Sequence, residues 1–238
     1  MMKQKPTIIY ENTVAGSFVR RDQPFHSGGS DRWGDRAGSC EKDGAFAGAS
    51  GAESEGDAAE DVEYESKTAY DLISVYKPKL KWVNIDSLAP NALMKQLYMS
   101  LNYDLVKAEH TYGDSRIDFY MEKNGEKFLT EVKGCTLADD LHPGIGLFPD
   151  APTERGVKHL HELTKAAKEG CHTAIAFVIQ MNGIHRVLPN ETAQTEFKKA
   201  LVEAAKAGVQ VVCYSCHVEA DSIKITGVIE DTSRFLNM

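Results

Sequence analysis

Residues 115–133, SRIDFYMEKNGEKFLTEVK, carry the strongest structural and chemical signal in this chain. The Asn-Gly pair at 124–125 separates two apolar runs, which predicts two antiparallel strands joined by a tight turn. Side chains alternate along a strand, so Glu131 and Lys133 share one face, and the hairpin brings Asp118 near both. Two carboxylates and a lysine on one face predict a divalent-metal centre for phosphodiester cleavage. A solvated charged face is the alternative interpretation of the same pattern.

The composition limits the classes of partner. The chain has 238 residues and a formal net charge of -8, which opposes general attraction to DNA or to an anionic membrane. Any contact with nucleic acid therefore requires a local basic patch. No apolar run is long enough to span a membrane, and the first residues lack the core of a signal peptide. We expect a cytoplasmic protein that makes no contact with membranes.

The five cysteines are scattered, and their odd number favours reduced thiols over a disulfide framework. Cys213 and Cys216 form one C-x-x-C inside the apolar run VVCYSCHV. A zinc site there would need two further ligands, and only His217 lies nearby in sequence. Buried cysteines on a strand are the preferred interpretation, and zinc is the alternative.

The order of elements predicts a mixed α/β (α+β) fold. From Pro90 onward the pattern gives a helix, the hairpin, a third strand near residues 145–148, and then helix, strand, helix and strand. The run AIAFVIQ at 174–180 is continuously apolar, as expected of a central strand, and residues 221–229 are expected at an edge. A mixed sheet flanked by helices matches the core order of the PD-(D/E)xK nuclease-like fold.

Several phrases together resemble one family. RIDF, EVKGCTL, LFPDAPTERGVKHLHEL and AFVIQ, with YDLISV and WVNIDS upstream, resemble the sugar fermentation stimulation protein (SfsA) family over about residues 69–227. The resemblance implies an N-terminal OB-fold-like domain, a C-terminal nuclease-like domain, DNA binding, and regulation of sugar utilisation, notably of maltose. No settled catalytic activity is implied.

The resemblance also assigns residues. Asp118, Glu131 and Lys133 match the acidic pair and the lysine of the expected catalytic site, with Asp118 and Glu131 as ligands for Mg²⁺. Three residues of the PDAxTxRGxKH phrase, at the start of the next helix, are expected to bind nucleic acid: Arg155, Lys158 and His159. A solvated helix face paired with neighbouring glutamates is the alternative.

The N-terminal region departs from the family pattern. Residues 1–68 take the place of the OB-like domain, but residues 25–65 are rich in Gly, Ala, Ser, Asp and Glu and show no strand or helix period. We expect this segment to be disordered or irregular, and residues 69–238 to form the nuclease-like domain. With permitted codon choices, a one-base shift of the reading frame can turn residues 25–50 into an alternating sequence that resembles the family's barrel. Two compensating frameshifts, near residues 22 and 65, are our hypothesis for the anomaly.

Three functions remain in competition. The first is a DNA-binding regulator of the SfsA type, and the second is an Mg²⁺-dependent nuclease acting on DNA or RNA. The third is a crippled copy that no longer binds DNA. Resequencing the gene across residues 20–66 tests the third, and metal-dependent cleavage of labelled nucleic acid separates the first two.

Overall fold

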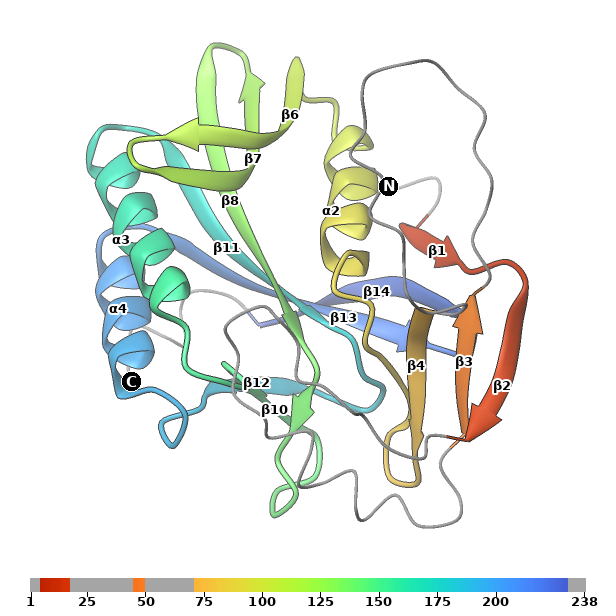
Figure 1. The fold of residues 1–238 in the computed structure, drawn as a ribbon. Coiled ribbons are helices and arrows are strands. Elements are labelled where there is room, and N and C mark those ends of the chain that lie inside the picture. Colours follow the sequence, from red (N-terminus) through yellow and green to blue (C-terminus); the bar gives the residue numbers. More distant parts are fainter. Residues whose placement is uncertain (1–4, 18–44, 50–70, 231–238) are drawn as a thin grey trace.

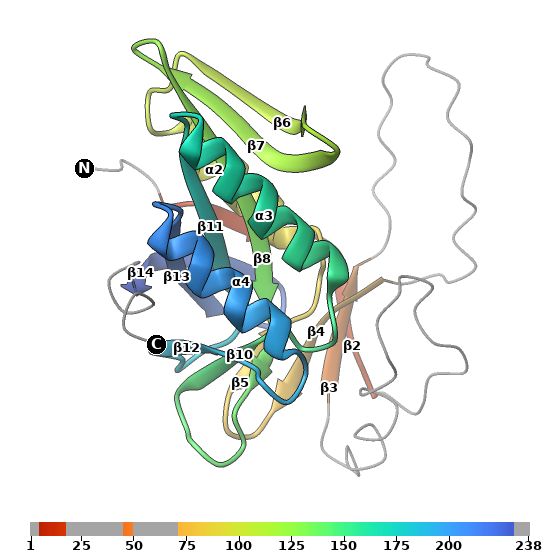
Figure 2. The ribbon, with the colours of Figure 1, turned by 90° about the vertical axis from the view of Figure 1, so that its left-hand side faces the viewer.

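The described part of the computed structural model comprises residues 5–17, 45–49 and 71–230. Its main feature is a curled seven-stranded mixed sheet with the order β1-β14-β13-β11-β8-β7-β6 (Figures 1 and 2). The strands of this sheet are β1 (Thr7–Ile9), β6 (Leu105–Tyr112), β7 (Ser115–Lys123), β8 (Glu126–Cys135), β11 (His172–Ile179), β13 (Gln210–Val218) and β14 (Ser222–Glu230). The expected mixed sheet flanked by helices is confirmed.

Helices cover both faces of the sheet. Helices α3 (Glu154–Lys168) and α4 (Thr195–Lys206) lie on one face, and α2 (Ala89–Met99) lies on the other (Figure 2). The central strand β11 contributes side chains to the cores on both faces of the sheet. Ile175 and Phe177 belong to the core beneath α3 and α4, while Ala176 and Val178 belong to the core beneath α2. A strand that is buried on both faces must be apolar at every position, which explains the continuous run predicted there.

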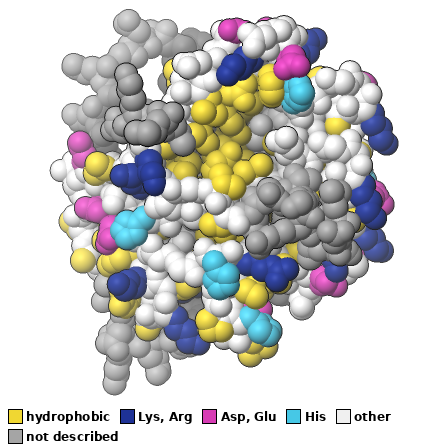
Figure 3. All heavy atoms as spheres, turned by 180° about the vertical axis from the view of Figure 1, so that it is seen from behind, with side chains coloured by type: hydrophobic (Ala, Val, Ile, Leu, Met, Phe, Trp, Pro, Cys, Tyr) yellow, Lys and Arg dark blue, Asp and Glu magenta, His cyan; other side chains and the backbone are white. Residues whose placement is uncertain are grey.

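The core under α2 has hydrophobic side chains at its margin. Several aromatic and aliphatic side chains packed against its core remain partly exposed, among them Tyr103, Val106, Phe128 and Tyr214. Figure 3 shows hydrophobic side chains gathered in one area of the molecule seen from behind.

The hairpin predicted at residues 115–133 is confirmed. Lys123 pairs with Glu126, and the two turn residues have positive φ angles of 52° at Asn124 and 81° at Gly125. Two successive positive φ angles define the turn that matches the twist of a hairpin, and Asn-Gly adopts them at little cost. The turn sets the register that places β7 beside β8.

Three elements of the structure differ from the expectation. Strand β6 has no counterpart among the predicted elements, because its residues are mostly polar and exposed at the sheet edge, where little apolar alternation is needed. Strand β14 is not the edge expected at 221–229, since β1 pairs along its outer side. Helix α4 begins at Thr195 and not at Glu191, where the sequence predicts its start, because residues 191–193 form a turn.

A second sheet has the order β2-β3-β4-β5, formed by β2 (Thr13–Ser17), β3 (Ala45–Ala49), β4 (Asp71–Lys77) and β5 (Lys81–Asn84). Strand β3 corrects the expectation that residues 25–65 contain no strand. It pairs with β2 and β4, and backbone hydrogen bonds can hold such a strand without apolar alternation. The rest of the segment expected to be disordered or frame-shifted lies outside the described residues.

The sheets divide the chain differently from the boundary expected at residue 69. Strands β4 and β5 belong to the sheet of β2 and β3, while β1, from the N-terminal region, joins the seven-stranded sheet. The two parts are in contact through Tyr10, whose hydroxyl donates to Asp86 at 2.9 Å and accepts from Asn84 at 3.1 Å.

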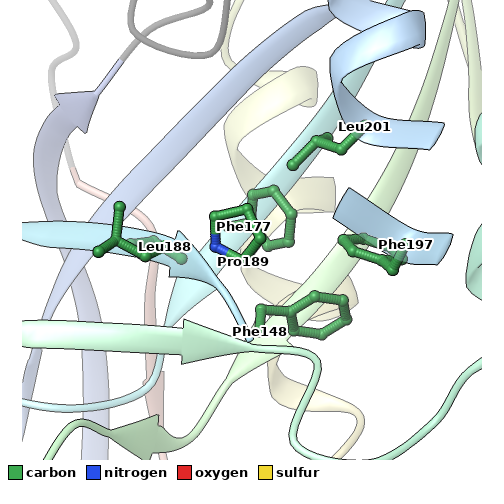
Figure 4. Close-up of a pocket in the computed structure, with 7 residues that line it drawn as sticks. Phe148, Phe177, Leu188, Pro189, Phe197 and Leu201 are labelled. Carbon is green, nitrogen blue, oxygen red and sulfur yellow. The ribbon is translucent and has the colours of Figure 1, made fainter. Parts of the chain in front are cut away.

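A third sheet has the order β12-β10-β9, and its strand β10 precedes α3 in the chain. It consists of β9 (Leu137–Ala138), β10 (Ile145–Phe148) and β12 (Arg186–Pro189). Phe148, at the end of β10, packs against Phe177 and Phe197 with ring centroids 5.1 Å apart in both pairs (Figure 4). This contact fixes the chain just before the loop that enters α3, and so helps to set the position of that helix.

Substituting Gly134 with Ala should destabilise the protein by about 1–3 kcal/mol. An added Cβ would lie 2.2 Å from Oε1 of Gln180, a buried side chain whose amide donates to Oδ1 of Asn84 and to the Asp86 carbonyl. The Gln180 side chain would have to leave both acceptors. Urea unfolding measures the loss. Gly227→Ala is the control, since its nearest contact would be 3.9 Å away. Equal stability of the two variants would contradict this account.

Candidate metal and phosphodiester site

Asp118 lies on β7 where the hairpin faces α2. Its Oδ1 accepts a hydrogen bond from the Asn91 side chain at 3.1 Å, and its Oδ2 accepts from the backbone N–H of Val132 at 2.7 Å. Asn91 is on α2 and Val132 is on β8, so three elements hold the carboxylate in one orientation. The side chain is half-buried.

Glu131 lies on β8 and is almost completely buried, with 1% of its surface exposed. Its Oε1 accepts from Nζ of Lys133 at 2.5 Å and also forms a hydrogen bond with Nδ1 of His159. Its Oε2 is buried and has no hydrogen-bond partner among the described residues. A buried carboxylate oxygen without a partner is costly unless something else binds it.

The two carboxylates are coupled electrostatically. Burial raises the pKa of Asp118, and the nearby charge of Glu131 raises it further, against the opposing effects of Val132, Lys133 and Asn91. Burial also acts to raise the pKa of Glu131, but the hydrogen bond from His159 and the charge of Lys133 outweigh it, so that this pKa is lowered. Opposite shifts in two neighbouring carboxyl groups are typical of sites built for chemistry or for cation binding.

Asp118→Asn should stabilise the metal-free protein at neutral pH. The raised pKa means that the folded state binds the Asp118 proton more tightly than the unfolded state does. Stability is therefore lost as the pH rises through the folded pKa. Asn cannot ionise, so the variant's advantage over the natural chain should grow as the pH rises above about 4 and level off above the folded pKa of Asp118. Urea unfolding in chelator across this range measures it. A difference that does not vary with pH would contradict the raised pKa.

The three residues predicted to bind nucleic acid do not share one environment. Arg155 and Lys158 are exposed, whereas His159 is buried and lies against Glu131. Nζ of Lys158 donates to the Asp114 carbonyl at 2.7 Å. The predicted surface role of His159 does not fit this placement: one turn of helix separates it from Arg155, but its ring points into the carboxylate site.

Helix α3 begins where the sequence predicts. Thr153 is the N-cap, and its hydroxyl accepts from the backbone N–H of Gly156 at 2.9 Å. Glu154 in the first turn and two lysines in the last turn complement the helix dipole. Because the cap fixes where the helix starts, it also fixes which residues of the second turn lie against β7 and β8, and His159 is one of them.

Sequence reasoning missed the contacts of two residues. Asn91 lies in the APN phrase that opens α2, 27 residues before Asp118, and no local spacing links the two. Helix periodicity places His159 near Arg155 and so predicts a surface position for it. Its burial against Glu131 depends on how α3 packs on the sheet, which periodicity alone does not determine.

Other candidate ligands stay apart from this site. Cys213 and Cys216 are buried on β13 without a disulfide, as expected of strand cysteines. Glu109 forms an exposed pair with Arg116 at 3.2 Å. Across residues 5–17, 45–49 and 71–230, no group of three or more His, Cys, Asp or Glu side chains is arranged to hold a metal ion. Within those ranges, Asp118 and Glu131 are therefore a pair of carboxylates, without a third such side chain.

Within the described ranges, no helix combines the length and the apolar character that crossing a membrane requires.

Comparison with known proteins gives a consistent result. A family model described as "Sugar fermentation stimulation protein RE domain" matches residues 85–222, more than half of the chain. A sugar fermentation stimulation protein homolog from Clostridium botulinum is 42% identical over 170 residues, covering 68% of this chain and 72% of the relative. A homolog from Desulfitobacterium hafniense is 44% identical over 163 residues, covering 66% of this chain and 69% of the relative.

A solved structure shares the fold. It is described as "The structure of Pyrococcus Furiosus SfsA in complex with Ca2+" and has a TM-score of 0.74 at 20% identity. The match covers 95% of this chain and 98% of the archaeal chain. The match to the family model begins at residue 85, one residue after the end of β5, and it includes every residue of the carboxylate site. This chain belongs to the sugar fermentation stimulation protein (SfsA) family.

Proposed function

We propose that this chain is a DNA-binding protein of the SfsA type whose site at Asp118, Glu131 and Lys133 cleaves phosphodiester bonds with Mg²⁺. The observation that carries the proposal is the state of Glu131. One of its oxygens is held by Lys133 and His159, and the other is buried without a partner among the described residues, beside a second carboxylate. In this proposal, Asp118, Glu131 and Lys133 take the roles of the acidic pair and the lysine of PD-(D/E)xK nucleases.

The residues present fit a hard divalent cation. Oε2 of Glu131 accepts no hydrogen bond from the described residues, so its lone pairs can coordinate a cation. Each oxygen of Asp118 accepts one hydrogen bond and has a further lone pair for a cation. Two carboxylates suffice for Mg²⁺, which usually keeps several waters and takes substrate phosphate as a further ligand. The Pyrococcus furiosus protein was solved in complex with Ca²⁺, which supports a divalent cation as a ligand in this family.

The side chains have separable roles. When bound, the cation supplies a Lewis acid and a more acidic water. Asp118 and Glu131 would hold the cation through their carboxylate oxygens. The ammonium of Lys133 has three N–H donors and gives one to Glu131, which leaves two for a phosphate oxygen as negative charge develops.

DNA would approach along the exposed start of α3. Arg155 and Lys158 are the cations of this helix turn, and its N-terminus favours phosphate. The formal charge of -8 means that such binding must be local. The relatives' names connect the family with sugar fermentation, and we extend to this chain a role in regulating sugar utilisation, notably of maltose.

The test is cleavage of end-labelled single- and double-stranded DNA and RNA by the purified full chain, with Mg²⁺, Mn²⁺ or chelator. Metal-dependent products support the nuclease. DNA binding without products under every condition would leave a DNA-binding regulator and remove catalysis. If neither binding nor cleavage occurs, while a chain with the reading frame restored over residues 22–65 binds DNA, the crippled-copy hypothesis holds.

Arg155→Ala combined with Lys158→Ala should weaken DNA binding about equally for all sequences. Each phosphate contact that is lost should reduce the slope of log K against log salt by roughly 0.9 for duplex DNA. Fluorescence anisotropy at several salt concentrations measures affinity and slope. Lys168→Ala, in the last turn of the same helix, is the matched control. An unchanged slope in the double variant would show that this face of α3 is solvated and does not contact DNA.

A further inference from the structure

The two oxygens of Glu131 have different environments. Oε1 receives two donors, Nζ of Lys133 from two residues along the same strand and Nδ1 of His159 from α3. Oε2 receives none from the described residues, although it is equally withdrawn from water. A carboxylate oxygen has about two lone-pair sites, so two donors occupy Oε1 fully. Only Oε2 remains for another ligand.

His159 is held in a defined orientation. Its side chain is 5% exposed, and Nε of Arg155 donates to its Nε2 at 3.4 Å. A ring nitrogen that accepts a hydrogen bond carries no proton, which assigns the ring proton to Nδ1. His159 therefore donates to Glu131 with a ring that α3 and Arg155 both orient.

From this geometry we infer that His159 is a positioning residue that restricts Glu131 to single-oxygen coordination and thereby sets which divalent cation the site prefers. The inference rests on the proposed metal site and deepens it. Mg²⁺ accepts one oxygen from each of a few carboxylates in a strict octahedron, whereas Ca²⁺ takes six to eight oxygens and readily uses both oxygens of one carboxylate. With Oε1 reserved by its two donors, Glu131 suits the smaller cation.

A positioning role for His159 has a consequence that a purely structural role would not have. If His159 merely supported the fold, its loss would weaken the binding of both cations together. If it reserves Oε1, its loss frees a second oxygen and favours Ca²⁺ selectively. The ratio of the two dissociation constants separates these cases, because general damage to the site largely cancels in it.

The experiment is titration calorimetry of the full chain with MgCl₂ and with CaCl₂. His159→Phe keeps a ring but removes the donor, and it should raise Ca²⁺ affinity relative to Mg²⁺ affinity by roughly tenfold or more. His159→Asn keeps an N–H near the position of Nδ1 and should retain the natural ratio. His161→Phe, an exposed histidine of the same helix, is the matched control.

Each outcome decides the inference. An unchanged ratio in a folded His159→Phe variant that binds both cations would overturn it and leave the proposed metal site standing. Failure of the natural chain to bind either cation would overturn both. Should His159→Phe fail to fold, Lys133→Met removes the other donor to Oε1 and must shift the ratio in the same direction. No shift in that variant would again overturn the inference.

Discussion

Asp118→Asn should reduce Mg²⁺-dependent cleavage of DNA by roughly a thousandfold or more, the largest effect that we expect from any single substitution. Asn keeps the shape of the side chain and one oxygen for the hydrogen bond from Val132 or Asn91, but it lacks the charge that holds a divalent cation. The same substitution should stabilise the metal-free fold. Lost activity in a more stable protein is the signature of a residue retained for chemistry rather than for folding.

Single-turnover cleavage of labelled DNA at saturating Mg²⁺ measures this loss. Asp114→Asn is the matched control: Asp114 is an exposed acid just before β7, and its contact with Lys158 uses the backbone carbonyl. Cleavage that persists at the natural rate in highly purified Asp118→Asn would place the chemistry elsewhere.

Phe177→Ala should cost about 3–5 kcal/mol and lower the melting temperature by roughly 6–20 °C. Phe177 is 1% exposed at the centre of β11, and its ring packs against Phe148 (Figure 4). Removing the ring leaves a cavity where the β12-β10-β9 sheet meets the core under α4. Neighbouring strands on both sides of β11 limit how far the backbone can relax into it.

Calorimetry and urea unfolding together measure the loss for Phe177→Ala. Val228→Ala is the control, because this β14 side chain is 58% exposed and a surface change of this kind usually stays within about 0.5 kcal/mol. A melting temperature equal to that of the natural chain would show that β11 is not the centre of the core.

Local patterns determined much of the fold. The Asn-Gly turn and the apolar run of β11 each act over a few residues, and the structure has both where the sequence predicts them. The sequence pattern does not predict strand β6, because an exposed edge strand needs little apolar alternation. Strand β3 is not predicted for a different reason. Its pairing with β2 and β4 relies on backbone groups, which every residue carries.

The carboxylate site was predictable only in part. The hairpin register brings Asp118 to Glu131, since a two-residue turn leaves a single pairing, and alternation puts Lys133 beside Glu131. Asn91 and His159 come from helices that are distant in sequence, and their contacts depend on the packing of α2 and α3 on opposite faces of the sheet.

By itself, the sequence determined the family, the hairpin and the acidic pair with its lysine, because short-range periodicity and turn chemistry encode them. Only the tertiary structure decided that His159 faces inward, that Oε1 of Glu131 is occupied while Oε2 has no partner among the described residues, and that β1 closes the sheet beside β14. These features arise from helix packing and strand pairing between distant segments. Such contacts depend on the shapes of both partners at once, which no local pattern records.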